Sequence, residues 1–359
     1  MIYIHVPLCR SFCTYCGFYS EIARDGCKEK YLKALTAEIL SSKGKDPGPV
    51  NTLYIGGGTP SVLDVADFRR VLSALEEAGF GTTFEEFTVE VNPEDIVTRG
   101  PSYVDGLLSL GVNRISVGIQ SLSDDILKWM NRRHDASRGL EALRILRQSG
   151  VDNLSTDLIF GISGLSDEVW EDTIRRLLAA ARPEHLSAYQ LSLEEGSALA
   201  EKVEAGAYEE AAEDQCSLQY DLLCRLMRGE GYEHYEISNW ALPGHRALHN
   251  SGYWRRIPYL GFGGGAHSFD GRVRFWNSPE ISDYPAESEI LEEKDVILER
   301  IMLSLRTADG EDGAFLHEHC REDVLGRLLD EGALIGQGSR IRIPEERFFV
   351  SDEIIKELI

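Results

Sequence analysis

The stretch YIHVPLCRSFCTYCGF, residues 3–18, joins a short run of β-forming residues to three closely spaced cysteines. Cys9, Cys13 and Cys16 form the pattern C-x3-C-x2-C in the loop after Pro7. Thiolates are natural ligands of iron–sulfur clusters, and three of them leave one corner of a four-iron cluster open to another ligand. Structural zinc normally takes four ligands, often from two C-x2-C pairs, and this sequence has no second pair. We therefore expect a cluster and keep zinc as the alternative.

Outward from this stretch, short β-forming runs alternate with longer amphipathic segments. Six candidate strands lie at residues 2–6, 52–55, 86–91, 114–119, 153–160 and 185–193. Segments with apolar residues at helical spacing lie between them, at residues 31–40, 65–78, 103–110, 139–148 and 168–181. Strands joined through helices run parallel, and about six such units curl into a full or partial barrel. The sequence therefore predicts an α/β barrel whose functional groups lie at the carboxyl ends of the strands.

The pattern changes after residue 195. An acidic helical stretch at residues 198–228 is followed by an aromatic and glycine-rich segment at 232–269, which we expect to cap the barrel. Helical patterns follow at 296–306, 314–319 and 323–331, with short strands around Ile341 and Phe348, an order typical of a small winged-helix-like domain. The expected division is a barrel over residues 1–230, an extension over 231–290 and a C-terminal domain over 291–359.

Charge and hydropathy exclude several classes of partner. The chain of 359 residues has 37 basic and 60 acidic side chains, a formal charge of −23 that repels phosphate backbones. Winged helices often bind DNA, but residues 291–359 hold nine Lys/Arg against seventeen Asp/Glu, so nucleic acid is not expected as a partner. The sequence has no apolar run that approaches the ~20 residues needed to cross a bilayer. It shows no export signal, and its seven cysteines, an odd number, favour metal or redox chemistry over a set of disulfides. We expect a cytoplasmic protein without an integral membrane segment.

Glycines and polar residues end several of the candidate strands. Gly56, Gly57, Gly58 and Thr59 follow the second strand, where backbone without side chains can approach a bound molecule; alone, such a run also fits a tight turn. Later strands carry polar groups that could bind a ribose, an amino group or a carboxylate, namely Glu90, Gln120, Asp157 and, shortly after Gln120, Arg132. The alternative is that these side chains pair with one another inside the barrel.

A third group of residues combines histidine with large aromatic side chains. HNSGYW, residues 249–254, precedes the glycine-rich stretch YLGFGGGAHS at 259–268. An imidazole beside aromatic rings suits ligation and stacking of a flat macrocycle such as haem. A histidine near tryptophan is also commonly a hydrogen-bonded core residue. His249 is thus a candidate haem ligand, with His245 and His267 as alternatives.

Together these motifs resemble a known family, the radical S-adenosylmethionine (SAM) proteins related to oxygen-independent coproporphyrinogen III oxidase, in their HemW-type haem chaperone branch. The resemblance covers nearly the whole chain. Besides the segments already quoted, it rests on YIGGGTPS at 54–61, VEVNP at 89–93, NRISVGIQS at 113–121, TDLIFG at 156–161, HLSAYQLSLE at 185–194 and YEISNWA at 235–241.

The resemblance implies a partial (β/α)6 barrel with a [4Fe-4S] cluster on the three cysteines. The open iron of that cluster would chelate SAM, and one electron from a donor protein would cleave SAM to methionine and a deoxyadenosyl radical. The residues that match positions expected around SAM are Tyr3, Gly57, Gly58, Thr59, Glu90, Gln120, Arg132 and Asp157. Arg133, the next residue, is the alternative to Arg132. HNSGYW matches a haem-binding pattern of this branch, which favours His249.

One departure separates two functions. In the true porphyrinogen oxidases the cluster motif continues to a further cysteine two residues after the third, whereas this chain has Phe18 there. The resemblance therefore favours a chaperone that binds haem or another porphyrin as cargo and passes it to a haem-acceptor protein. The alternative is an enzyme that oxidatively decarboxylates the propionates of coproporphyrinogen III. The sequence leaves open whether the chain is an enzyme, so no catalytic residue is assigned.

Overall fold

The computed structural model describes residues 1–45 and 51–359 and is built around one large sheet. The sheet has nine strands in the order β11-β1-β4-β5-β6-β7-β8-β10-β9. Seven of them are parallel neighbours: β1 (Ile2–Val6), β4 (Thr52–Gly57), β5 (Glu86–Val91), β6 (Arg114–Gln120), β7 (Leu154–Phe160), β8 (His185–Gln190) and β11 (Leu260–Phe262). β10 (Asn239–Ala241) and β9 (Glu233–Glu236) continue it antiparallel. All six predicted strands are confirmed, and the predicted partial barrel with them.

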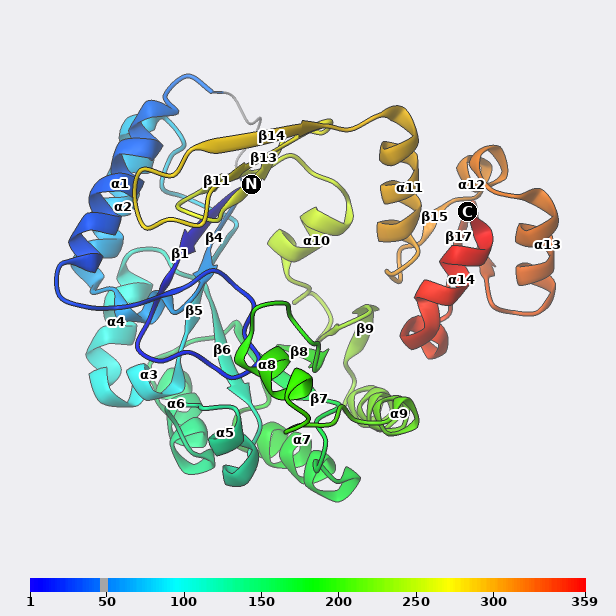
Figure 1. Ribbon diagram of the computed structural model, residues 1–359, viewed down its shortest axis with the longest axis horizontal. Coiled ribbons are helices and arrows are strands. Elements are labelled where there is room, and N and C mark those ends of the chain that lie inside the picture. Colours follow the sequence, from blue (N-terminus) through cyan, green and yellow to red (C-terminus); the bar gives the residue numbers. More distant parts are fainter. Residues whose placement is uncertain (46–50) are drawn as a thin grey trace.

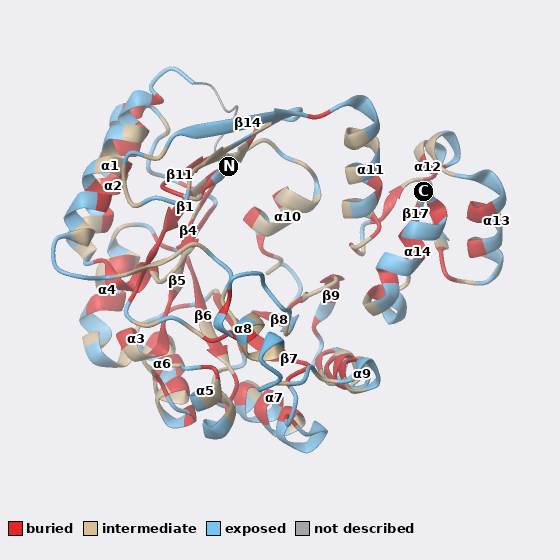
Figure 2. Cartoon of the chain, in the orientation of Figure 1, coloured by how far each residue is buried: buried red, intermediate tan, exposed pale blue. Residues whose placement is uncertain are grey.

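Helices cover the outer face of this curved sheet, as Figure 1 shows. They are α1 (Cys27–Ser41), α2 (Val65–Ala78), α3 (Pro93–Arg99), α4 (Pro101–Ser109), α5 (Asp124–Trp129), α6 (Ala136–Gln148), α7 (Asp167–Ala181) and α9 (Glu213–Gly229). The short helix α8 (Ala198–Glu204) lies instead against the N-terminal loop, where Leu199 N donates to Thr14 O at 2.8 Å. Figure 2 shows that each long helix is buried on one side and exposed on the other. The expected single helical stretch at 198–228 is two helices, because Gly206 takes a left-handed conformation (φ 67°) just after α8.

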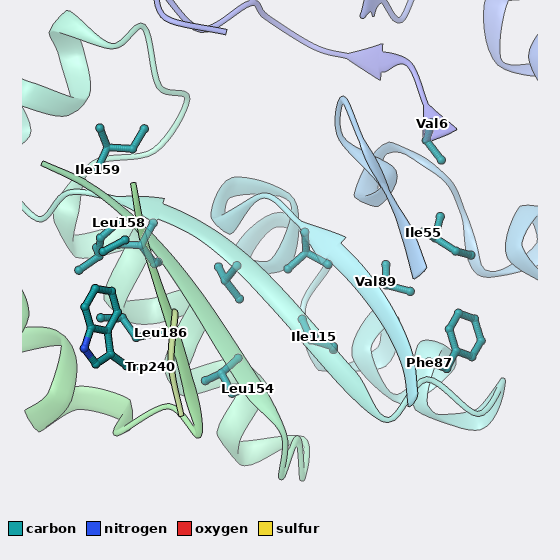
Figure 3. Packing of buried hydrophobic residues seen from close by; sticks show 14 of the residues in the cluster. Val6, Ile55, Phe87, Val89, Ile115, Leu154, Leu158, Ile159, Leu186 and Trp240 are labelled. Atoms are coloured by element: carbon teal, nitrogen blue, oxygen red, sulfur yellow. The ribbon is translucent and has the colours of Figure 1, made fainter. Parts of the chain in front are cut away.

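The core lies between the strands and these helices. Figure 3 shows Val6, Ile55, Val89 and Ile115 on successive strands of the sheet, and all four side chains are buried. The residues that alternate with them are mostly polar or glycine, for example Arg114, Ser116 and Gly118 on β6. Successive side chains of a strand point to opposite faces, so one face of the sheet packs against helices while the other lines a polar barrel interior.

The segment after α9 joins both edges of the barrel. β9 and β10 pair beyond β8, whereas β11 pairs with β1 at the opposite edge. The short helix α10 (Leu248–Trp254) lies between them in the chain. A separate antiparallel sheet of β12 (His267–Phe269), β13 (Val273–Asn277) and β14 (Ala286–Ile290) follows, and β14 is exposed along its length.

The C-terminal region has the winged-helix-like order that the sequence predicts. It consists of α11 (Glu293–Ser304), β15 (Glu311–Asp312), α12 (Gly313–His319), α13 (Glu322–Asp330), β16 (Ile335–Gln337), β17 (Arg340–Arg342) and α14 (Ser351–Leu358), with the sheet order β15-β17-β16. The strand expected at Phe348 is wrong. Phe348 lies in a 3₁₀ segment, Glu345–Val350, where it is buried in the hydrophobic core and its ring meets His234 edge-on at 4.9 Å between centroids. Among the described residues, no helix is long and apolar enough to span a bilayer.

Candidate functional site

The three cysteines lie on one loop at the carboxyl end of β1. Its base is closed by a parallel pairing of β2 (Leu8–Cys9) with β3 (Glu21–Ile22), in which Ala23 N donates to Cys9 O at 2.8 Å. Its middle is attached to the end of α5, where Thr14 N donates to Met130 O at 3.1 Å. The loop is therefore held at both its base and its turn, and crosses the mouth of the barrel (Figure 1).

Each of two cysteine thiols contacts a residue from another part of the barrel. Cys9 Sγ lies 3.4 Å from Thr59 Oγ1, and Arg132 Nη1 donates to Cys13 Sγ at 3.3 Å. Burial raises the pKa of the Cys9 and Cys16 thiols, an effect that the Arg132 guanidinium partly opposes. A bound cation would stabilise the thiolates much more strongly than one guanidinium can.

The cysteine loop fits a cluster better than a single ion. Within residues 1–45 and 51–359, no three His, Cys, Asp or Glu side chains lie close enough to hold one metal ion. Tetrahedral zinc needs its ligands to converge on one point, so the zinc alternative finds no ready site here. A four-iron cluster takes each thiolate on a different iron atom, which lets the three sulfurs stand apart. Three thiols without a fourth ligand therefore fit the cluster.

The glycine run packs directly beneath the cysteine loop. A Cβ on Gly58 would lie 3.0 Å from Cys9 Sγ and 2.9 Å from Val6 O. Gly57 adopts φ 109°, a conformation that other residues rarely take, and its N–H donates to Glu90 Oε2 at 3.2 Å. The run is thus both a tight turn and a close approach of backbone to the Cys9 thiol.

Two predicted carboxylates lie inside the barrel mouth. Tyr54 Oη donates to Glu90 Oε1 at 2.6 Å, and Ser116 Oγ donates to Asp157 Oδ1 at 3.2 Å. Burial raises the pKa of Glu90 to about 7, helped by the nearby charge of Asp157 and opposed by Tyr54. Burial also raises the pKa of Asp157, while the hydrogen bond with Ser187 acts to lower it. The carboxylates pair with hydroxyls, not with each other, and retain capacity to accept from a ligand.

Arg132, and not its neighbour Arg133, faces the cysteine loop. Arg132 Nη2 donates to Gly118 O at 2.6 Å, while its Nε is buried and has no hydrogen-bond partner among the described residues. Arg133 Nη2 instead donates to Asp95 Oδ1 at 2.9 Å. Gln120 ends β6 at φ 66°, at a register irregularity of the β6 and β7 pairing, which turns the chain toward the mouth. An unpaired guanidinium nitrogen here suits an anionic group of a ligand.

Other residues of the barrel interior were not singled out from the sequence. Tyr54 Oη donates to Glu90, and His5 Nδ1 lies 3.0 Å from the hydroxyl of Tyr3, a residue that the sequence did predict for the site. Arg114 is buried, and its charge opposes the upward shift in the pKa of both Glu90 and Asp157. The signal was present in the alternation of polar residues within apolar strands, which marks an inward face.

HNSGYW forms α10, at the amino end of the strands. The backbone N–H groups of Leu248 and His249 donate to the Glu86 carboxylate at 2.7 and 2.9 Å. His249 is 1% exposed, with Nδ1 2.8 Å from Thr52 Oγ1 and Nε2 2.9 Å from Tyr253 Oη. In this conformation it is a hydrogen-bonded core histidine. Ligation of haem iron by His249, as predicted, would require the ring to leave these partners.

The other two candidate haem ligands differ in exposure. His267 is exposed on β12 and stacks on Trp276 at 6.1 Å between centroids, whereas His245 is half-buried. Neither lies on α10. The sequence prediction for His249 stays a prediction.

Comparison with known proteins agrees with the fold and the motifs. Residues 3–177 match the model of the Radical SAM superfamily. Relatives over the full length are named heme chaperone HemW: a protein of Mycobacterium tuberculosis, 31% identical over 100% of this chain and 94% of its own, and one of Lactococcus lactis, 29% identical over 99% and 96%. The solved coproporphyrinogen III oxidase HemN of Escherichia coli, a radical SAM enzyme, superimposes with a TM-score of 0.79 at 21% identity, covering 99% of this chain and 89% of that one.

Proposed function

Because this chain belongs to the HemW family of radical SAM proteins, we propose that it is a haem chaperone: it binds haem and transfers it to an acceptor protein. The observation that carries the proposal is the similarity to HemW proteins along the whole chain, including α10 and the C-terminal region, which lie beyond the radical SAM match. Phe18, at the position of the oxidases' further cysteine, supports binding over decarboxylation.

The radical SAM family implies a [4Fe-4S] cluster and SAM as cofactors. We propose Cys9, Cys13 and Cys16 as the cluster ligands, a choice supported by their common loop and by the contacts of Thr59 with Cys9 and of Arg132 with Cys13. When bound, the cluster supplies an iron that can chelate SAM and pass it one electron. The electron would come from a donor protein.

The residues proposed around SAM have separable roles. Arg132 presents a buried, unpaired Nε that suits a carboxylate, and its Nη1 also contacts Cys13, so it would join the ligand to the cluster loop. Gly57, Gly58 and Thr59 would give close backbone access. Polar acceptors for hydroxyl and amino groups would come from Tyr3, Glu90, Gln120 and Asp157.

We also propose the division of the chain into a barrel (1–230), an extension (231–290) and a C-terminal domain (291–359), and a cytoplasmic location. The division is supported by the separate small sheets after residue 260. The acidic surface and the net charge of −23 support the view that neither haem delivery nor SAM binding involves nucleic acid.

One experiment separates the chaperone from the enzyme. Anaerobically reconstituted protein is titrated with haem and, in parallel, incubated with coproporphyrinogen III, SAM and a reductant. The chaperone proposal expects one haem per chain by absorbance titration and no product with a vinyl group. Vinyl product would overturn it in favour of a coproporphyrinogen III dehydrogenase.

The same titration tests the axial ligand. We compare His249→Gln, His245→Gln and His267→Gln by the haem absorption spectrum, with thermal unfolding as a check on folding. Our proposal that His249 ligates the iron expects a changed spectrum in His249→Gln alone. An unchanged spectrum in that variant would contradict the assignment, without contradicting haem binding.

A further inference from the structure

A large cavity lies between α10, α11 and the C-terminal sheet, away from the cysteine loop. Its volume is about 1110 Å³, at the upper end of the range for small-molecule sites. α10 contributes Ser251 and Trp254, and α11 contributes Arg300 and Ser304. None of the residues proposed to bind SAM lines it. The space is therefore large enough for a ligand other than SAM, in a separate place.

The lining of this cavity is positive in a strongly acidic protein. Six arginines line it, Arg246, Arg255, Arg256, Arg300, Arg340 and Arg342, against three carboxylates, Asp309, Glu311 and Glu345. The whole chain carries −23. Positive charge is thus concentrated here, as expected for a site that receives an anion.

The six arginines of the lining do not each have a carboxylate of their own. Arg246 and Arg255 share Asp309, at 3.2 and 2.8 Å, and Arg246 also reaches Glu233 outside the lining. Arg340 donates only to the backbone oxygens of Asp309 and Gly310, and makes no ion pair among the described residues.

The remaining three arginines do have acidic partners. Arg300 pairs with Glu311 through two hydrogen bonds of 2.8 and 2.9 Å, and Arg256 pairs with Glu299, which is not part of the lining. Arg342 is only weakly paired, 3.9 Å from Glu345. The excess positive charge therefore resides mainly on the C-terminal sheet and on the pair that shares Asp309.

Two donors in the lining are buried without an acceptor. Trp254 Nε1 and Arg342 Nη1 have no hydrogen-bond partner among the described residues. An unsatisfied buried donor costs about 1–3 kcal/mol, so each is a place where a ligand oxygen would be stabilised. Both belong to elements that face each other across the cavity, α10 and β17.

The side chains of the HNSGYW motif on α10 have different surroundings. His249 and Tyr253 bond to each other, and His249 also bonds to Thr52 at the barrel end, whereas Trp254 lines the cavity. None of the described residues that line the cavity is His, Cys or Met, the usual side-chain ligands of haem iron. A haem placed here would be held by its carboxylates and its ring face, and ligation of its iron by His249 would require that ring to leave Thr52 and Tyr253.

We propose that this cavity binds the two carboxylate groups of a porphyrin, with Arg340 and Arg342 as their partners and the Trp254 indole against the macrocycle. This inference rests on the proposed haem-binding function and adds its recognition chemistry. Arginine forks hold carboxylates in a bidentate way, and aromatic rings stack on flat π-systems. The carboxylates and the ring face of a porphyrin are present with or without iron, so the metal-free porphyrin is a suitable probe of this site.

The test uses the full-length reconstituted protein and two probes, metal-free protoporphyrin IX and its dimethyl ester. Binding is followed by quenching of tryptophan fluorescence. We expect the diacid to bind at least tenfold more tightly than the ester. Arg342→Gln should raise the Kd for the diacid at least tenfold and leave the Kd for the ester unchanged, because the substitution removes the charged partner of a carboxylate that only the diacid has. Arg347→Gln, an exposed arginine outside the lining, is the matched control.

The outcomes separate this inference from the proposed function. The inference is overturned if haem binds stoichiometrically while the diacid and its ester bind equally well and Arg342→Gln changes neither affinity. That result leaves the chaperone proposal standing. Failure of the wild-type protein to bind haem overturns the chaperone proposal, while binding of the diacid that depends on Arg342 would still support the cavity. Should Arg342→Gln not fold, the comparison of diacid with ester on the wild-type protein decides.

Discussion

Two buried histidines at the amino end of the barrel and Arg132 at its carboxyl end differ in how far their polar atoms find hydrogen-bond partners. At the amino end, His249 uses both ring nitrogens, and His185 does the same, with Ser155 Oγ at 2.9 Å and Tyr235 Oη at 2.8 Å. At the carboxyl end, Arg132 Nε has no partner in the described chain, and Gln120 has a positive φ. These two histidines are satisfied by the protein itself, whereas Arg132 leaves hydrogen-bonding capacity unused.

This difference separates stability from ligand binding. Buried polar groups that are fully paired stabilise a unique packing, while unpaired groups and strained backbone persist where something else uses them. Substitutions at the carboxyl end should therefore affect cofactors, and substitutions at the amino end should affect unfolding.

The largest effect should follow from removal of one cluster thiolate. Cys13→Ala leaves two cysteines on the loop, too few to hold a four-iron cluster, so iron and sulfide should fall from about four per chain to near zero. Iron analysis and the visible spectrum of anaerobic protein measure this. Cys320→Ala, in the C-terminal domain, is the control and should keep its iron. A full complement of iron in Cys13→Ala would contradict the site.

The next effect concerns SAM affinity. Arg132→Lys keeps the charge but removes the planar fork, so the Kd for SAM should rise at least tenfold, about 1.4 kcal/mol. Arg133→Lys should change it less than twofold, because Arg133 bonds to Asp95 instead. Equilibrium dialysis under anaerobic conditions measures both. Equal effects in the two variants, with the iron content intact, would show that Arg132 was wrongly chosen.

At the amino end, Thr52→Val should act on stability alone. Valine has nearly the shape of threonine, but leaves His249 Nδ1 buried without a partner, which should lower the free energy of unfolding by about 1–3 kcal/mol. Denaturant unfolding measures the change, and SAM affinity should stay the same. Thr98→Val, whose hydroxyl is exposed on α3, should cost less than about 0.5 kcal/mol. Loss of SAM binding in Thr52→Val would erase the distinction between the two ends.

The carboxyl end was much easier to predict from the sequence than the amino end. The alternation of strands and helices, together with the cysteine spacing, predicted the six parallel strands and put Cys9, Gly58 and Glu90 at one edge, because parallel strands bring their carboxyl ends together. The structure brings Thr59 to Cys9 and Arg132 to Cys13, contacts between residues far apart in sequence.

The amino end could not be predicted because α10 lies outside the repeated strand and helix pattern that brings the carboxyl ends of the strands together. Nothing local in HNSGYW indicates that His249 bonds to Thr52, or that Glu86 accepts the first N–H groups of α10. The strand expected at Phe348 was wrong, and that buried ring meets His234, a partner far away in sequence. The contacts and burial of such residues depend on partners that are distant in sequence, and the spacing of apolar residues alone does not identify those partners.

The smallest effect is a pH dependence located at the amino end. Burial lowers the pKa of His249 to about 3, with further contributions from the chain's amino group and from Arg114. The unfolded chain has a histidine pKa near 6.5, so protonation favours unfolding. The stability that the neutral ring contributes is therefore fully present above pH 6.5 and is lost progressively as the pH falls from 6.5 toward 3.

Comparison of wild type with His249→Gln isolates this contribution. Between pH 7.5 and 5.5 the free energy of unfolding of the wild-type protein should fall by about 1.4 kcal/mol more than that of the variant, because glutamine does not titrate. Other buried histidines, such as His234, are present in both proteins and cancel in the difference. Parallel curves would mean that His249 is already accessible to protons in the folded state. The barrel end would then open readily, and the histidine would be available to haem iron without the displacement that its two hydrogen bonds otherwise demand.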